Sequence, residues 1–600
     1  MSKEPLSLFH NELLQFLKRE VAAKSKEGGY DPSQLQLLQH SLSPASSDAA
    51  LPLSEIIDNY QHLFGAKGPI HIEKALIHAF PPKEFIDLGL AKYFPRVYRG
   101  LPRIYHRDSP MQSHIKKNFT HLPTLKRIAA ERSVFSLYQN YEIESHSRVV
   151  LFTWVISDGL GDYQAAIEAA KIIKERFPHL DLRMIALVPK KHSSLSLPDL
   201  CPAHLIPYEE DFSLSLITPD VLAILRSSDL ILQMPTFYPF TTDLSKLLGI
   251  AAAKWISLGE YGFLESSWFH PKTGNRSMGL HFLEAGVLLR KPHPASFAEV
   301  ENELLSQWLF GIVKPGPVEI DQYLAQKRFY LAYLTTRLGG AVYLHALLQS
   351  LVHDEKDIDI CTPDLGWFVE HASKQNEMKR PILEGDLAVG SLQVHFGNEV
   401  HSISVGAKGK RVRLLCPGTI SASDFRSLVS LSGEFVGVRG DQSFSEAVSA
   451  NKVFFYDGRE HARYFMKDLG ALAENRIAPH RGTLSCFRGM NKAFLHNLPV
   501  QEEDWVDETF FQELEDWKQI AQEIGLALQD PDTIAGAKKL NRIIAEELSC
   551  NEYLCHLVQR GLCHQKHPEM ERLESQQMAL FTSNQISFNS LITSLKPSAS

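Results

Sequence analysis

Several features are scarce in or missing from this sequence, and each absence narrows the class of protein. Cysteine is rare, with 7 residues in 600, and the number is odd. A disulfide framework is therefore not indicated, and a reducing compartment is the simplest expectation. No apolar run reaches the roughly 20 residues that span a bilayer, and the N-terminal segment MSKEPLSLFHNELLQF has no apolar core of a secretory signal. We therefore expect a cytoplasmic protein without a membrane span.

An excess of basic charge is also missing. The formal net charge is -8 at pH 7. Nucleic-acid-binding proteins normally carry a basic face, so no nucleic-acid partner is expected. The pattern Gly-x-x-x-x-Gly-Lys-Ser/Thr does not occur, which argues against an NTPase. No Cys-x-x-Cys pair occurs either, and Cys550 and Cys555 are five positions apart in a helical stretch, so no metal site is expected.

Apolar runs alternate with amphipathic segments through the middle of the chain. Residues 149–156, VVLFTWVI, are continuously apolar and β-branched, which predicts a strand buried on both faces. In the next segment Ala169, Ala170 and Ile173 recur at the spacing of one helix face. Strand, helix and strand then alternate with short loops, which predicts a parallel sheet covered by helices. A second series of the same kind begins near Lys327.

These patterns predict an α/β protein with two Rossmann-like lobes that face a cleft. Doubly wound sheets bind ligands at the carboxyl ends of their strands, so the loops that follow the strands are where chemistry is expected. The expected parts are a mainly helical N-terminal extension over 1–146, a first Rossmann-like lobe over 147–326, a second over 327–490, and a helical C-terminal region with a loose tail over 491–600.

The first such loop carries two carboxylates on a glycine turn. Asp158, Gly159, Gly161 and Asp162 follow the first predicted strand and lead directly into a helix. The glycines let another molecule approach the backbone, and the helix start presents unpaired N–H groups. One carboxylate suffices to cap a helix, so the second is available to face a ligand. Plain helix capping is the simpler alternative for this loop.

A second loop of this kind, RGDQS, occupies residues 439–443 after an apolar run that ends at Val438. The N–H groups and dipole of the helix that it opens, together with Arg439, form a ready site for a diphosphate. Asp441 would be repelled by that phosphate unless it faces sugar hydroxyls or a cationic acceptor. Glu446, one turn further on, fits either a site residue or a solvated helix face. An ordinary capped helix is again the alternative.

Together the two loops resemble those of a known family. Two Rossmann-like halves with such loops are similar to a GT-B glycosyltransferase, and more closely to the bacterial protein-arginine rhamnosyltransferase of elongation factor P. That family carries Asp-Asn-Phe-Gly-Asp where this chain has Asp-Gly-Leu-Gly-Asp at 158–162. It carries Arg-Gly-Glu-Asp-Ser-Phe where this chain has Arg-Gly-Asp-Gln-Ser-Phe at 439–444. The stretch EAGVLLRKP at 284–292 corresponds to a third family segment.

The resemblance implies roles for the motif residues. Asp158, Asp162 and Asp441 would be catalytic, with Asp441 in place of the family's Glu and the first two holding or deprotonating an acceptor arginine. The lobe over 147–326 would bind the acceptor and the lobe over 327–490 the nucleotide sugar, and Gly159 and Gly161 would line the acceptor side. The nucleotide sugar would be bound by Arg439, Gly440, Gln442, Ser443 and Phe444.

Two further strand ends add candidates. Glu260 ends an apolar strand of the first half and is placed to line the same site on the acceptor side, with an ordinary strand-end carboxylate as the alternative. Tyr333 closes the first strand of the second half and is a candidate to stack on the nucleotide base, with a core tyrosine as the alternative.

The predicted function is therefore metal-independent glycosyl transfer from a nucleotide sugar, without a further cofactor, to an acceptor that the resemblance implies is a protein arginine. One alternative is a non-catalytic interaction protein on a decayed GT-B scaffold, since the family's Glu-Asp pair is replaced at 441 and 442. Another is a nucleotide-sugar epimerase, which would need no protein acceptor. The helical ends also fit an effector secreted into a host cell.

Overall fold

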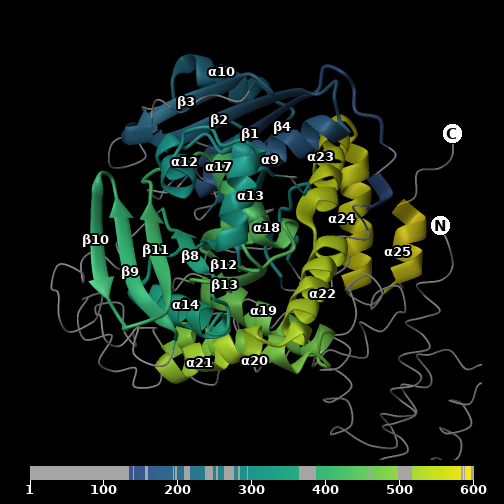
Figure 1. Ribbon diagram of the computed structural model, residues 1–600. Coiled ribbons are helices and arrows are strands. Elements are labelled where there is room, and N and C mark those ends of the chain that lie inside the picture. The colour runs from purple at the N-terminus through teal and green to yellow at the C-terminus, as the bar shows by residue number, and fades with distance from the viewer. Residues whose placement is uncertain are drawn as a thin grey trace, which may run out of the picture. The chain divides into compact units, whose positions relative to one another are not determined.

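The computed structural model in Figure 1 describes about three fifths of the chain, mainly from residue 141 onward. The described residues are 134, 136–138, 141–155, 160–192, 195, 199–208, 217–236, 248–251, 254–262, 276–280, 284–292, 295–363, 387–458, 462–496, 517–582, 585–586 and 588–595. The predicted N-terminal helical extension therefore lies almost wholly outside the described residues, as do Asp158 and Gly159.

The chain divides into two compact units. The larger comprises Arg148–Leu264 and Asn275–Leu554 and contains every strand among the described residues. The smaller comprises Met1–Ser147, Glu265–Gly274 and Cys555–Ser600. Both predicted lobes thus belong to the larger unit.

The first lobe is a parallel sheet with the strand order of a doubly wound Rossmann fold. Its order is β3-β2-β1-β4-β5-β6, and every neighbouring pair is parallel. Since the strand order reverses between β1 and β4, this is the switch point where such sheets bind ligands. The elements are β1 Arg148–Trp154, α9 Gly161–Arg176, β2 Asp181–Pro189, β3 Ala203–Tyr208, α10 Pro219–Ser227, β4 Leu230–Thr236, β5 Trp255–Tyr261 and β6 Arg276–Met278.

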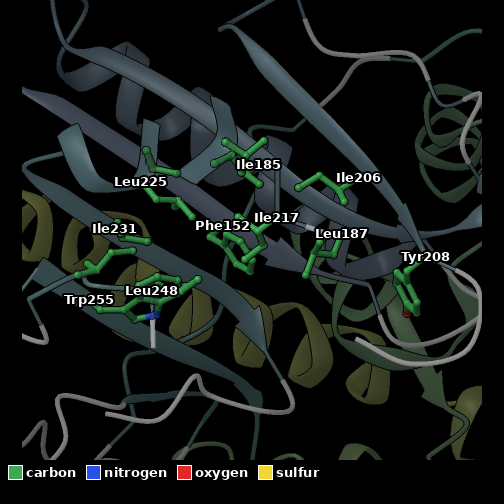
Figure 2. Close-up of a cluster of buried hydrophobic side chains, with 13 residues drawn as sticks. Phe152, Ile185, Leu187, Ile206, Tyr208, Ile217, Leu225, Ile231, Leu248 and Trp255 are labelled. Carbon is green, nitrogen blue, oxygen red and sulfur yellow. The ribbon is translucent and has the colours of Figure 1, made fainter. Parts of the chain in front are cut away.

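Apolar side chains from β1, β2 and β4 form the core of this lobe. Figure 2 shows Phe152 of β1 among Ile185 of β2, Ile231 of β4 and Trp255 of β5. The ring centroids of Phe152 and Trp255 are 5.5 Å apart. The buried strand and the helix face predicted from the sequence are confirmed, since Val149–Phe152 and the predicted face of α9 are buried.

The second lobe repeats this order and adds a hairpin. The sheet order is β10-β9-β11-β8-β7, and the parallel pair β12-β13 joins it through a parallel bridge between Ala332 and Gly437. In the central strands β11-β8-β7-β12-β13, the first strand, β7, therefore again lies between the strands that precede and those that follow the reversal of strand order. The strands are β7 Lys327–Leu331, β8 Asp357–Cys361, β9 Val389–Phe396, β10 Glu399–Ser404, β11 Lys410–Cys416, β12 Phe435–Val438 and β13 Val453–Tyr456.

Helices surround these strands, and in Figure 1 β10, β9 and β11 run side by side at the edge of the sheet. The sequence patterns assigned no structure to the antiparallel β9–β10 hairpin, nor to helices α12 and α13. The helices of this half are α12 Glu303–Phe310, α13 Pro317–Gln326, α14 Arg337–Ser350, α17 Ala422–Leu431, α18 Gly440–Ser449, α19 Arg463–Arg476, α20 Arg481–His496, α21 Trp517–Leu528 and α22 Pro531–Glu547.

The described residues from Trp517 onward are largely helical, and the loose tail expected near the C-terminus is wrong over Phe588–Leu595, which forms a helix. Helix α23, Cys550–Lys566, crosses from the larger unit into the smaller, which also contains η3 Ser136–Tyr138, α24 Pro568–Thr582 and α25 Phe588–Leu595. Within the smaller unit, the hydroxyl of Tyr138 donates to Oε2 of Glu574 over 2.7 Å. All seven cysteines are buried free thiols. Among the described helices, none combines the length and the apolar character that crossing a bilayer requires.

Candidate functional site

The first turns of two helices, one from each lobe, meet beyond the carboxyl ends of the strands. Asp162 is the second residue of α9, directly after the loop that follows β1, and Asp441 is the second residue of α18, directly after β12. The N–H of Tyr261, the last residue of β5, donates to Oδ2 of Asp441 over 2.7 Å. A Cβ added at Gly161 would lie 4.0 Å from Cβ of Gln442. The first turns of α9 and α18 are therefore in contact across the two lobes.

Three carboxyl groups with raised pKa values lie at this meeting point. Burial raises the pKa of Asp441 to about 7, although the hydrogen bond from the N–H of Tyr261 lowers it in part. Burial and then the charge of Asp441 raise the pKa of Asp162 to about 7. Burial, followed by the charges of Asp162 and Asp441, also raises the pKa of Glu260 well above its usual value. The site therefore retains protons near neutral pH.

No basic partner offsets these charges among the residues that the structure describes. Within those ranges, no Lys, Arg or His lies within ion-pair distance of Asp162, Glu260 or Asp441. Each of the three side chains is partly exposed. The described residues also contain no group of His, Cys, Asp and Glu with the geometry to hold a metal ion. Among the described residues, the three carboxyl groups thus form an acidic cluster without a cationic partner.

The start of α18 has no side-chain cap. Arg439 is its N-cap residue and makes no side-chain capping bond, and Gly440 has a φ of +76°. The first N–H groups of a helix have no partner within the helix, so they point toward whatever lies beyond its end. Ser443 is turned inward, since its hydroxyl accepts from the N–H of Arg439 over 2.8 Å and donates to the carbonyl of Arg439 over 2.5 Å.

The start of α14, which follows β7, is closed by contrast. Oδ2 of Asp457 accepts the N–H groups of Thr335 and Thr336 over 2.7 and 2.9 Å. A buried carboxylate therefore already occupies the anion-binding position of this helix, and a Cβ added at Gly339 would collide with Asp457. Of these two helix starts in the second lobe, α18 is the one where no carboxylate caps the first turn among the described residues.

The structure places the remaining candidates in different settings. Tyr333 is partly buried and packs edge-on against Phe425, with ring centroids 5.3 Å apart. Phe444 is completely buried and lies edge-on to Phe454 and Phe465 in the core. Gln442 donates from Nε2 to Oε1 of Glu446 over 3.1 Å.

The solvated helix face considered for Glu446 is wrong. Its side chain is 4% exposed and is paired with the guanidinium of Arg290, which is 3% exposed. Sequence reasoning assigned no role to Arg290, although it lies within the EAGVLLRKP stretch that the family resemblance singled out. The partner of a buried charge cannot be read from a sequence, because it depends on which elements pack together.

Comparisons with known proteins give only distant likenesses. No established family model matches the chain, and no match occurs among curated proteins. Similar solved structures include the E. coli heptosyltransferase WaaC with ADP, at 15% identity and a TM-score of 0.24, covering 52% of this chain and 86% of that one. Another is the E. coli trehalose-6-phosphate protein bound with UDP-2-fluoro glucose, at 12% identity and a TM-score of 0.36, covering 69% of this chain and 99% of that one. A third is Acinetobacter baumannii MurG, at 12% identity and a TM-score of 0.30, also covering 69% of this chain and 99% of that one. With TM-scores this low, the architecture rests on the sheet topology described above.

Proposed function

We propose that this chain transfers a sugar from a nucleotide-sugar donor to an acceptor. The observation that carries the proposal is the contact between the two lobes at their strand ends. There Asp441, in the first turn of α18, accepts the N–H of Tyr261 at the end of β5. The charge of Asp441 helps to raise the pKa of Asp162, and the charges of both aspartates help to raise the pKa of Glu260. The motif resemblance of residues 158–162 and 439–444 supports the same function.

The second lobe would bind the donor. As the glycosidic bond to the diphosphate breaks, negative charge develops on the leaving group and positive charge on the sugar. The N–H groups at the start of α18, assisted by Arg439, would stabilise the diphosphate. The Asp441 carboxylate beside them would stabilise the positive charge on the sugar. No metal ion is needed in this scheme, because the helix start and a guanidinium supply the positive charge.

The acidic site suits a cationic acceptor, and we propose a protein arginine. A guanidinium binds carboxylates bidentately and would supply the positive charge that the described residues do not. In the transfer step an acceptor nitrogen forms a bond to the anomeric carbon while the bond to the diphosphate breaks, with inversion. The released proton would pass to Asp162 or Asp441, whose raised pKa values make them better bases than ordinary aspartates.

The test begins with binding and continues with turnover. The protein is screened by thermal shift against a panel of nucleotide sugars, and the stabilising donor is incubated with arginine-containing protein or peptide. We expect stabilisation by one class of donor and release of the nucleoside diphosphate together with a glycosylated acceptor. A folded sample that no nucleotide sugar stabilises would instead support an interaction protein.

A further inference from the structure

Arg290 joins the two helices that begin at the site. It is the last residue of a segment after β6, residues 284–290, which we call the strap. Its guanidinium Nε lies 3.0 Å from Oε2 of Glu168 in α9, and Nη1 contacts Oε1 of Glu446 in α18. Nη2 also donates to the main-chain oxygen of Gln164 in α9 over 3.3 Å. One buried side chain therefore bonds to a helix of each lobe.

The strap is itself tied to both lobes. The N–H of Leu288 donates to the hydroxyl of Tyr261 in β5 over 2.8 Å, and that hydroxyl is 2.7 Å from Oγ of Ser445 in α18. The N–H of Arg290 donates to Oγ of Ser449 in α18 over 3.2 Å. These bonds fix the point from which the guanidinium extends.

The network reaches the catalytic candidates through the helices. Gln442, which donates to Glu446, is the neighbour of Asp441 in the first turn of α18. In α9, Glu168 lies six residues after Asp162, which is about 9 Å along a helix axis. Because each helix moves as a rigid body, a displacement of the Arg290 guanidinium would also displace the first turns of α9 and α18.

The charges of this network are buried and nearly balanced. The side chains of Glu168 and Glu446 are 11% and 4% exposed, and Arg426 adds a second cation 3.8 Å from Glu446. Burying ions costs about as much free energy as their pairing returns, so such a network contributes more to geometry than to stability. We propose that Arg290 is a positioning residue that holds Asp162 and Asp441 at the separation needed for transfer. This inference rests on the proposed function.

The separation of the helix starts can be measured without any substrate. The 4.0 Å between a Cβ at position 161 and that of residue 442 is suitable for a disulfide. Gly161→Cys with Gln442→Cys is therefore expected to crosslink rapidly under mild oxidation, while the native cysteines are buried. The crosslinking rate is then compared in backgrounds with and without Arg290.

Removing Arg290 alone would leave two buried carboxylates without their main partner and endanger folding. The test variant is therefore the triple substitution Glu168→Gln, Arg290→Met and Glu446→Gln, which removes the buried charges together. Arg290→Lys is the conservative variant, since it keeps the charge and loses the fork that spans two helices. Unfolding temperatures establish that each variant is folded before its crosslinking rate is read.

We expect the triple variant to crosslink several-fold more slowly and Arg290→Lys to lie between it and the wild type. Without the crosslinking cysteines, kcat of the triple variant should fall about 100-fold with the donor KM little changed, because small misplacements of reacting groups cost that much. An unchanged crosslinking rate overturns the proposal whatever happens to kcat, and slower crosslinking with an unchanged kcat overturns the link to transfer. If the wild-type protein turns over no nucleotide sugar, the proposed function fails, and the crosslinking rates still decide whether Arg290 holds the helix starts together.

Discussion

The N–H of Tyr261 donates to Oδ2 of Asp441 over 2.7 Å, and this bond joins the end of a strand in one lobe to the start of a helix in the other. The same tyrosine bonds through its hydroxyl to the strap and to Ser445 of α18. Tyr261 therefore fixes the orientation of the Asp441 carboxylate relative to the first lobe. This geometry makes Asp441 the first residue to test.

Asp441→Asn should lower the rate of sugar transfer by about 10²- to 10⁴-fold, because an amide cannot take up the acceptor's proton. At about pH 4, where the Asp441 carboxyl is protonated in the folded protein, the unfolding temperature should change little, since the amide oxygen still accepts the N–H of Tyr261. The measurement is release of nucleoside diphosphate in the presence of acceptor.

Asp424→Asn is the matched control for this change. Asp424 also lies in the first turn of a helix, α17, and accepts the N–H groups of Glu301 and Asn302 over 2.7 and 3.0 Å. This variant should lose stability but keep its turnover per folded molecule. Turnover by Asp441→Asn equal to that of the wild type would remove Asp441 from the catalytic residues.

Much of the fold could be predicted because its signals are local. The apolar run at 149–156 became the buried strand β1, and the predicted alternation gave two parallel sheets. The β9–β10 hairpin escaped prediction because β10 is an exposed edge strand whose residues show no buried face. Its order in the sheet depends on pairing with β11, which a local pattern does not encode.

For the site, the sequence predicted the positions of the strands and helix starts but not the contacts of the side chains. The motif at 439–443 was correctly expected after a strand and at a helix start. The sequence did not indicate that Ser443 bonds to the backbone of Arg439, or that Glu446 is buried against Arg290. Both outcomes depend on side-chain direction and on a partner 156 residues away.

The raised pKa values of Asp162 and Asp441 predict a pH dependence of stability. The folded protein binds protons at these groups up to about pH 7, whereas the unfolded chain releases them near its ordinary value of 3.8. Their contribution to the free energy of unfolding is therefore fully present below about pH 4 and is lost as the pH rises to about 7.

The measurement is denaturant unfolding from pH 4 to pH 8, with the wild type compared with Asp162→Asn/Asp441→Asn. The double variant should lack this component, so its stability relative to the wild type should increase with pH. The comparison is needed because other carboxyl groups titrate in the same range with the opposite sign, such as Asp181, whose pKa is lowered by Arg148 and Arg183 against the effect of burial. A difference between the two proteins that does not vary with pH would contradict the raised pKa values.

Gly440→Ala should weaken donor binding. Gly440 has a φ of +76°, which costs a residue with a Cβ about 1–2 kcal/mol, so the start of α18 would shift to relieve the strain. Gly311→Ala is the matched control, since Gly311 also has a φ of +76° and open space around its Cβ but lies at the end of α12. Both variants should lose similar stability, and donor affinity, measured by calorimetry, should fall for Gly440→Ala alone. Equal donor affinities in the two variants would argue against a diphosphate site at α18.

Tyr261→Phe separates the role of the tyrosine ring from that of its hydroxyl. Removing the hydroxyl leaves the buried N–H of Leu288 without its acceptor, which should cost about 1–3 kcal/mol of unfolding free energy. The strap would then be held less firmly, so the rate of transfer should also fall. Tyr343→Phe is the control, because the buried hydroxyl of Tyr343 donates to the carbonyls of Leu331 and Phe435 within the second lobe. It should lose comparable stability with an unchanged kcat, and an equal loss of kcat in both variants would show that the effect is general destabilisation rather than orientation of the site.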